Sequence, residues 1–151
     1  MTSNPRSTKA AVTAHAATGA STLACRAARR NAAARGAAAE TIAADYLQAQ
    51  GLTLIARNLR CKAGELDIVC IDADVLVIVE VRLRSRTDYG GALASITMSK
   101  QRKIVRATRF FWQRHGAWQA RTLRFDVIAL QSGPQTAPTI EWVRDAFREA
   151  R

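Results

Sequence analysis

The sequence predicts an α/β domain in which helices flank a mixed β-sheet, with the elements in the order α-β-β-β-α-β. The length of 151 residues and the hydrophobic fraction of 48% are typical of one globular domain with its own core. Apolar side chains recur at helical spacing in residues 29–50 and 97–115. Segments rich in β-branched or aliphatic residues follow each of them, which favours strands.

The first helix is expected over residues 29–50, where Ala is abundant. Ile42, Tyr46 and Leu47 fall on one stripe at a spacing of 3.6 residues, so we expect that stripe to face the core. Gly51 is expected to end the helix, because glycine readily adopts the left-handed conformation required there.

Three strands are expected next, at 52–60, 65–71 and 75–83, and they form a meander. Residues 85–95 contain Asp88, Gly90 and Gly91, which indicates a loop. The second helix, at 97–115, is expected to point Ile104, Ala107, Thr108 and Phe111 inward. A strand at 123–130 follows, and Ile140 to Val143 is expected to add an edge strand.

The charge of the chain favours a polyanionic partner. Lys and Arg number 23 against 12 Asp and Glu, so the net charge is +11, and residues 40–151 alone retain +5. A positive field of this size attracts phosphate polyanions or an anionic membrane surface. The longest aliphatic run, Val75 to Val79, is too short to span a bilayer, so we exclude a transmembrane protein and expect no membrane partner.

The first 39 residues carry six basic side chains and no acid. We expect residues 1–30 to form a basic, Ala-rich, disordered tail and residues 31–151 to form the folded domain. An export signal or an organellar transit peptide is the alternative for this segment. The three cysteines, Cys25, Cys61 and Cys70, form no C-x-x-C pair and are odd in number, which predicts a reducing, cytoplasmic location.

The candidate chemistry lies in residues 64–82. If Ala73 and Asp74 form a two-residue hairpin loop, the numbers of paired residues sum to 147. Asp67 then lies opposite Glu80, Glu65 lies opposite Arg82, and all four side chains project from one face. A three-residue loop would instead place Asp67 opposite Val79.

Two carboxylates about 5 Å apart repel each other unless a cation lies between them. Mg²⁺ or Mn²⁺ would satisfy Asp67 and Glu80 and would suit metal-assisted phosphodiester hydrolysis. The alternative is that Glu80 pairs with Arg82 or another cation, and that Asp67 is a polar residue at the end of a strand.

A series of short motifs resembles a known family. The motifs are Glu40 with Ala43 and Tyr46-Leu47, then Arg57-Asn58, Gly64-Glu65-Leu66-Asp67, Val79-Glu80-Val81-Arg82, Lys100 and Arg124-Phe125-Asp126-Val127. In this order and spacing, over residues 35–131, the chain resembles the bacterial YraN-like family, uncharacterised protein family 0102. The resemblance implies a restriction-endonuclease-like fold, similar to that of archaeal Holliday-junction resolvases.

The resemblance also implies roles for single residues. Asp67 and Glu80 would be metal ligands, with the backbone carbonyl of Val81 as a third and Glu40 as an additional carboxylate. The family pattern has Lys where this chain has Arg82. Arg82 can stabilise negative charge, but it cannot act as a general base because its guanidinium does not deprotonate at useful pH.

The second predicted helix presents a row of cations. Arg102, Arg106 and Arg109 recur at i, i+4 and i+7 beside Lys103, and no acid occurs between Asp88 and Asp126. Such a stripe is suited to phosphates and gives affinity without sequence readout. A solvated basic face without a ligand is the alternative.

Together these features predict a structure-selective, Mg²⁺-dependent endonuclease that acts on branched or single-strand-containing DNA. Arg82 and Lys100 would stabilise charge on the phosphate. The alternatives are a catalytically impaired nucleic-acid-binding module and a basic protein-interaction module. Resolvase-like cleavage of two strands would require a homodimer.

Overall fold

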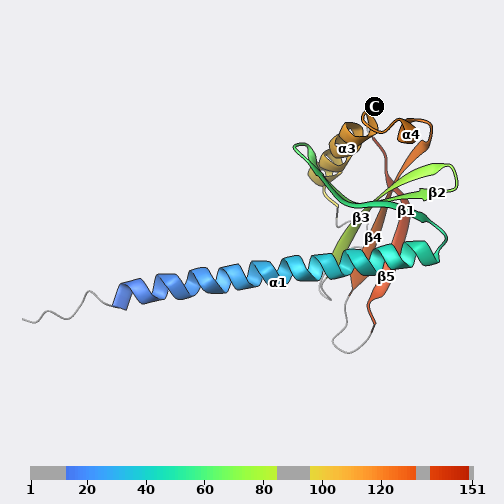
Figure 1. Ribbon diagram of the computed structural model, residues 1–151. Coiled ribbons are helices and arrows are strands. Elements are labelled where there is room, and N and C mark those ends of the chain that lie inside the picture. The colour runs from blue at the N-terminus through green and yellow to red at the C-terminus, as the bar shows by residue number, and fades with distance from the viewer. Residues whose placement is uncertain (1–12, 85–95, 132–136, 150–151) are drawn as a thin grey trace, which may run out of the picture. The chain divides into compact units, whose positions relative to one another are not determined.

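The computed structural model describes residues 13–84, 96–131 and 137–149, and side chains from residue 22 onward. The loop expected at 85–95 and the first twelve residues of the expected tail lie outside the described residues. None of the described helices combines the length and apolar character needed to cross a membrane. The elements are α1 (Thr13–Ala49), β1 (Thr53–Cys61), β2 (Gly64–Asp72), β3 (Val75–Arg84), α3 (Met98–Trp112), α4 (Gly116–Gln119), β4 (Thr122–Gln131) and β5 (Thr139–Phe147) (Figure 1).

The strands form one five-stranded sheet in the order β1-β2-β3-β4-β5. β1, β2 and β3 are the expected antiparallel meander, and the chain then passes through α3 and α4 to β4, which lies parallel to β3. β5 pairs antiparallel with β4 and extends well beyond the predicted edge strand. The predicted α/β class is confirmed, and this mixed sheet flanked by helices suits a restriction-endonuclease-like fold.

The first helix begins much earlier than the predicted start at residue 29. The chain divides into two compact units, Met1–Arg35 and Gly36–Arg151, and α1 contributes to both. All residues from 22 to 35 are exposed, so burial does not stabilise the helix there. The difference from the expected tail arises because Ala has the highest helix propensity and no Pro interrupts residues 13–49.

The end of α1 follows the prediction. Gly51 has φ of 89°, and its N–H donates to the Gln48 carbonyl at 2.9 Å. The N–H of Leu52 reaches back to the Leu47 carbonyl at 3.1 Å, which completes a Schellman motif. Leu52 is itself buried, so the turn directs the chain into the core before β1 begins.

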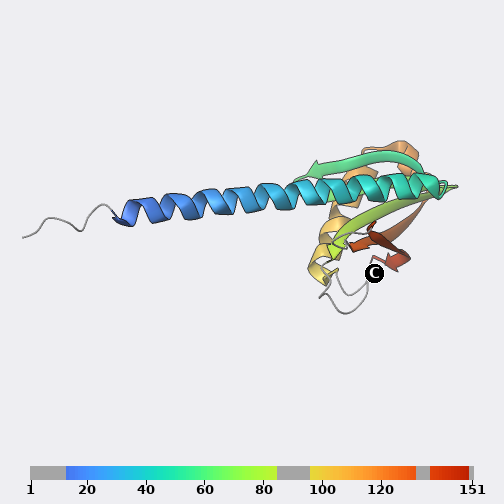
Figure 2. The same ribbon diagram turned by 90° about the horizontal axis from the view of Figure 1, so that it is seen from below.

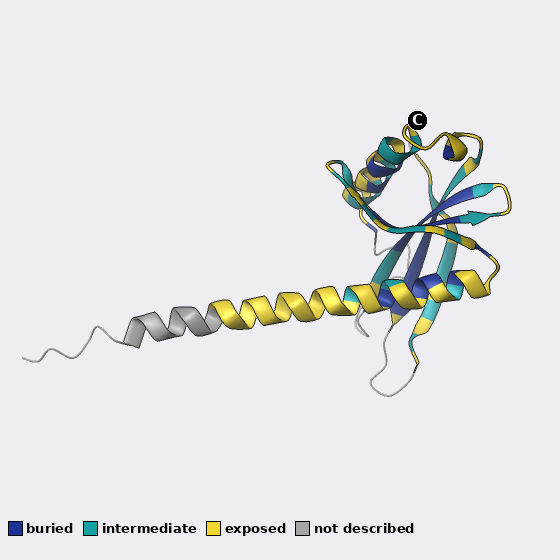
Figure 3. Cartoon of the chain, viewed as in Figure 1, coloured by how far each residue is buried: buried dark blue, intermediate teal, exposed yellow. Residues whose placement is uncertain are grey.

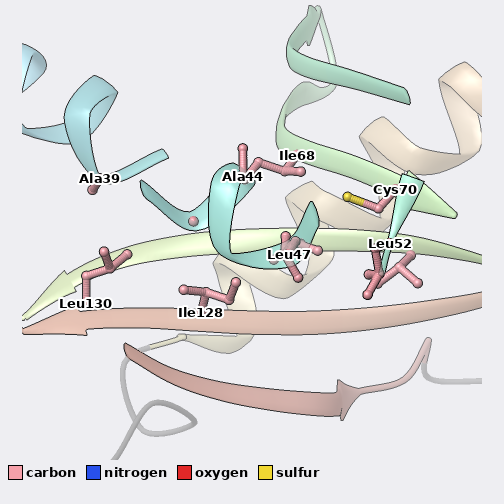
Figure 4. Packing of buried hydrophobic residues seen from close by; sticks show 11 residues of the cluster. Ala39, Ala44, Leu47, Leu52, Ile68, Cys70, Ile128 and Leu130 are labelled. Carbon is pink, nitrogen blue, oxygen red and sulfur yellow. The ribbon is translucent and has the colours of Figure 1, made fainter. Parts of the chain in front are cut away.

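The C-terminal part of α1 covers one face of the sheet. The residues that it buries are small or aliphatic: Ala39, Ala43, Ala44 and Leu47. They pack against Ile68, Cys70, Val77, Val79, Ile128 and Leu130 of three strands, as Figure 4 shows for part of this cluster. The prediction for Ile42 was wrong, since it is 37% exposed. Alanines occupy the contact because they let the helix axis approach the sheet closely.

The helix α3 covers the opposite face of the sheet (Figures 1 and 2). Ile104, Ala107 and Thr108 are buried as expected, and Phe111 is partly buried. Their apolar partners are mainly Leu66, Val69, Leu76 and Ile78. The helix begins after Thr97, whose hydroxyl accepts from the Lys100 N–H at 3.3 Å. The buried and exposed sides of both helices are visible in Figure 3.

Candidate functional site

The candidate site lies where β2 and β3 separate. The predicted register is confirmed from Asp72↔Val75 to Ile68↔Val79, with Ala73 and Asp74 as the two-residue loop. Beyond Val79 the regular pairing stops. Asp67, the next residue of β2, instead accepts a hydrogen bond at Oδ2 from the backbone N–H of Val81 at 2.9 Å. A side chain therefore continues the contact between the two strands after their ladder has ended.

The same geometry directs the carbonyl of Val81. In an extended strand the N–H and C=O of one residue point toward the same neighbouring strand. Because the N–H of Val81 points to Asp67, its carbonyl oxygen also points toward β2 rather than into the ladder with β4. The carbonyl oxygen of Val81 is therefore on the side of β3 that faces Asp67.

Glu80 is the buried acid of this site, with a relative exposure of 3%. It alternates with Val79 and Val81, which pack toward α1, so its side chain lies on the face covered by α3. From that helix Lys100 places Nζ 3.0 Å from Glu80 Oε1. Arg82 is more distant, with 3.8 Å between its guanidinium and the same oxygen. Glu80 therefore has a cationic partner, and the nearer cation is Lys100.

The electrostatics of Glu80 are unusual despite this ion pair. Burial, followed by the negative charge of Asp67, raises the pKa of Glu80 to about 7 from an ordinary value of 4.5. Lys100 acts in the opposite direction but does not compensate fully. Below about pH 7 the protonated form of Glu80 is consequently favoured, mainly because the side chain is buried.

The other deeply buried acid, Asp126, differs from Glu80 in its hydrogen-bond partners. Its two carboxylate oxygens accept from Arg124, Trp142 and the backbone N–H of Asp145 at 2.9–3.1 Å. It is fully buried and fully hydrogen-bonded, so it is a structural residue that fastens β4 to β5. Asp67 and Glu80 instead lie close enough to interact with each other, and their other partners are the Val81 N–H and Lys100.

Glu40 does not join this pair in the described structure. It is half-buried on α1, which covers the face of the sheet opposite to Glu80. No group of three or more His, Cys, Asp or Glu side chains is arranged to hold a metal ion within the described ranges. Glu40 is therefore not part of the carboxylate pair formed by Asp67 and Glu80.

Glu65 differs from the prediction. It was expected opposite Arg82, but it pairs with Arg60 of β1 in the register and forms an ion pair with it at 3.4 Å. The reason is that β2 pairs with β3 only from Ile68 to Asp72, so the residues before Ile68 pair with β1 alone. Arg82 is free of Glu65 and is 40% exposed at the mouth of the site.

The basic side chains of α3 are exposed as expected. Arg102, Lys103, Arg106 and Arg109 all lie on the side away from the core. The tertiary structure adds one acid that the sequence pattern missed, because Arg109 forms an ion pair with Glu149, forty residues later in the chain. The remaining three cations keep the stripe strongly positive.

Comparison with known proteins identifies the family of the chain. The model of uncharacterised protein family UPF0102 matches residues 39–130. The chain belongs to this family. A UPF0102 protein of Pseudomonas putida is 50% identical over 103 residues, which cover 68% of this chain and 84% of the relative.

Further UPF0102 relatives have similar sequence identities to this chain. The protein of Stutzerimonas stutzeri is 45% identical over 102 residues, which cover 68% of this chain and 84% of the relative. That of Pseudomonas syringae pv. syringae is 46% identical over 102 residues, covering 68% and 83%. The part matched by the UPF0102 model includes Asp67, Glu80 and the whole of α3, so the candidate site belongs to the family domain.

Proposed function

We propose that this UPF0102 protein binds nucleic acid and hydrolyses phosphodiester bonds with the help of Mg²⁺ or Mn²⁺. The observation that supports the proposal most directly is the fork between β2 and β3. Two carboxylates and a backbone carbonyl meet there, and the Lys100 ammonium lies 3.0 Å from Glu80.

The residues present fit a hard divalent cation. All three donors are oxygen atoms, and Mg²⁺ takes only one or two carboxylates while keeping several waters. Burial and then the negative charge of Asp67 raise the pKa of Glu80, and a divalent cation between the two carboxylates would favour its ionised form. When bound, Mg²⁺ or Mn²⁺ would polarise the phosphodiester and activate water. Asp67 and Glu80 would hold the ion, and the Val81 carbonyl would complete the set.

Lys100 provides the ammonium that position 82 lacks. Arg82 cannot release a proton, but Lys100 reaches the same Glu80 oxygen from α3. We assign Lys100 to stabilising the developing charge on the phosphate and Arg82 to binding the phosphate at the open side. Both roles require positive charge alone, so the exchange of Lys for Arg at position 82 is compatible with hydrolysis.

The proposed substrate is branched or single-strand-containing DNA. Arg102, Lys103 and Arg106 extend from the same helix as Lys100 and would contact backbone phosphates. Such contacts recognise the course of the backbone and not the bases. Cleavage of both strands of a junction would require a homodimer.

The competing function is a binding module that has lost catalysis through Arg82. Labelled four-way-junction, flap, single-stranded and duplex DNA, incubated with Mg²⁺ or Mn²⁺, separates the two. We expect metal-dependent cleavage by the native protein and by a control variant, Asp74→Asn, whose side chain is exposed in the β2–β3 turn, and none by Glu80→Gln, with binding in EDTA retained by all three. Cleavage that persists in Glu80→Gln would refute the site. Binding without cleavage, with activity gained in Arg82→Lys, would establish the competing function.

A further inference from the structure

A pocket of about 350 Å³ lies between the β1–β2 hairpin and α3, next to the carboxylate site. Two of its residues already have proposed roles: Lys100, which borders both sites, and Lys103, which was assigned to backbone phosphates. The residues that line the pocket come from the end of β1, the start of β2 and the first turns of α3: Arg60, Cys61, Gly64, Glu65, Lys100 and Lys103.

The base of the pocket depends on a close approach at Gly64. This residue has φ of +150°, and a Cβ added there would lie 3.2 Å from the backbone oxygen of Lys103. The same atom would lie 3.7 Å from Ala107 Cβ. Because any larger residue would push the hairpin away from α3, Gly64 holds the two walls at their present separation.

The charge of the pocket is positive. Its three cations are Arg60, Lys100 and Lys103, and its only carboxylate is Glu65. Glu65 engages Arg60 at 3.4 Å, with both side chains largely exposed, so solvent screens that pair. Lys103 is exposed, and within the described ranges it forms no ion pair. A pocket with this balance suits an anion.

The position of the pocket along β2 indicates which kind of anion it would bind. Glu65 and Asp67 are two residues apart on one strand, hence about 7 Å apart and on the same side. A nucleic-acid strand bound at Asp67 and Glu80 would continue past Lys100 directly into the pocket. Lys100 would then lie between two successive phosphates.

We infer that this pocket is a second phosphate subsite, which binds the backbone phosphate next to the one at the Asp67–Glu80 site. The ligand class is the phosphodiester backbone of a nucleic-acid strand. The inference rests on the proposed function, because it takes the position of the strand from the carboxylate site.

Cys61 offers a direct readout, because it lines the pocket and is half-buried. Cys25 is exposed and would react in the background, so the experiment uses the full chain with Cys25→Ser. Cys70 is fully buried, and burial raises the pKa of its thiol to about 12, so it does not compete. The rate of thiol labelling at Cys61 then reports occupancy of the pocket in EDTA, independently of cleavage.

The probe is a single-stranded oligothymidylate at low salt. We expect it to slow labelling of Cys61 about threefold or more, and we expect Lys103→Ala to abolish that protection. Lys103→Ala should also weaken binding and lower the slope of log affinity against log salt by about one, as expected for one lost phosphate contact. Arg144→Ala on β5, at the other edge of the sheet, is the charge-matched control and should keep the protection. Gly64→Ala alters no charge but changes the width of the pocket, so this variant should also lose the protection of Cys61.

Two results would overturn the subsite. One is that oligothymidylate slows the labelling of Cys61 equally in the protein with the native pocket and in the Lys103→Ala variant. The other is equal protection by millimolar inorganic phosphate and by the oligonucleotide, which would indicate a site for free phosphate. Cleavage assays on the same proteins keep the two proposals separate. Glu80-dependent cleavage without Lys103-dependent protection refutes the subsite alone, whereas Lys103-dependent protection without cleavage supports the subsite and refutes hydrolysis.

Discussion

Replacing Glu80 by Gln tests whether burial and the neighbouring Asp67 disfavour the ionised form of Glu80 in the folded protein. In the folded protein the pKa of Glu80 is about 7, against 4.5 as its ordinary value. Between these pH values the folded state binds more protons than the unfolded state, so the free energy of unfolding falls as pH rises. Above pH 7 the carboxylate is ionised in both states and the loss is complete.

The size of the effect follows from the two pKa values. Their difference of about 2.5 corresponds to about 3 kcal/mol, since a difference of one in pKa equals about 1.4 kcal/mol. Gln resembles the protonated acid in shape and cannot ionise. We therefore expect Glu80→Gln to match the native protein in stability near pH 4.5 and to exceed it by up to about 3 kcal/mol at pH 8.

Urea unfolding of both proteins from pH 4.5 to 8 measures this difference, and other titrating groups cancel in the comparison. Glu65→Gln is the control, because its carboxylate is exposed, and it should show no such trend. Mg²⁺ binds the ionised form, so at pH 8 it should stabilise the native protein and leave Glu80→Gln unchanged. A native protein that is more stable than Glu80→Gln at pH 8 without metal would refute the reasoning.

Three other expectations follow from the packing and the charges. Leu47→Ala should lower the free energy of unfolding by about 2–5 kcal/mol, while Ile42→Ala should cost well under half of that, as measured by urea denaturation; equal losses would contradict the alignment of α1 on the sheet. Asp126→Ala should cost about 3 kcal/mol or more, because it removes a fully buried acceptor from Arg124, from the Trp142 indole N–H and from the Asp145 N–H; a loss below about 1 kcal/mol would show that these bonds do not hold β5 to β4. Changing Arg102 and Arg106 together to Ala should weaken DNA binding about equally for all sequences and reduce the salt slope by about two in fluorescence anisotropy; a loss confined to one sequence would indicate base readout.

The carboxylate site could be predicted in part because it depends on a local hairpin. A two-residue loop at Ala73 and Asp74 determines every pair along β2 and β3, and that register follows from turn chemistry and alternation. What the pattern could not show is where the ladder stops. The two strands pair only from Ile68 onward along β2, so Glu65 pairs with Arg60 instead and the Val81 N–H donates to Asp67.

The amino-acid sequence by itself determined the class of the fold, the bounds of most elements to within a few residues, the register of the hairpin and the basic face of α3. These features depend on periodicity, turn residues and charge, which are local properties of the chain. Only the tertiary structure decided that Lys100 is the cation nearest to Glu80, that α1 contacts the sheet through alanines, and that Gly64 forms a pocket with α3. Those contacts join residues distant along the chain, and they exist only once both helices have packed on opposite faces of the sheet.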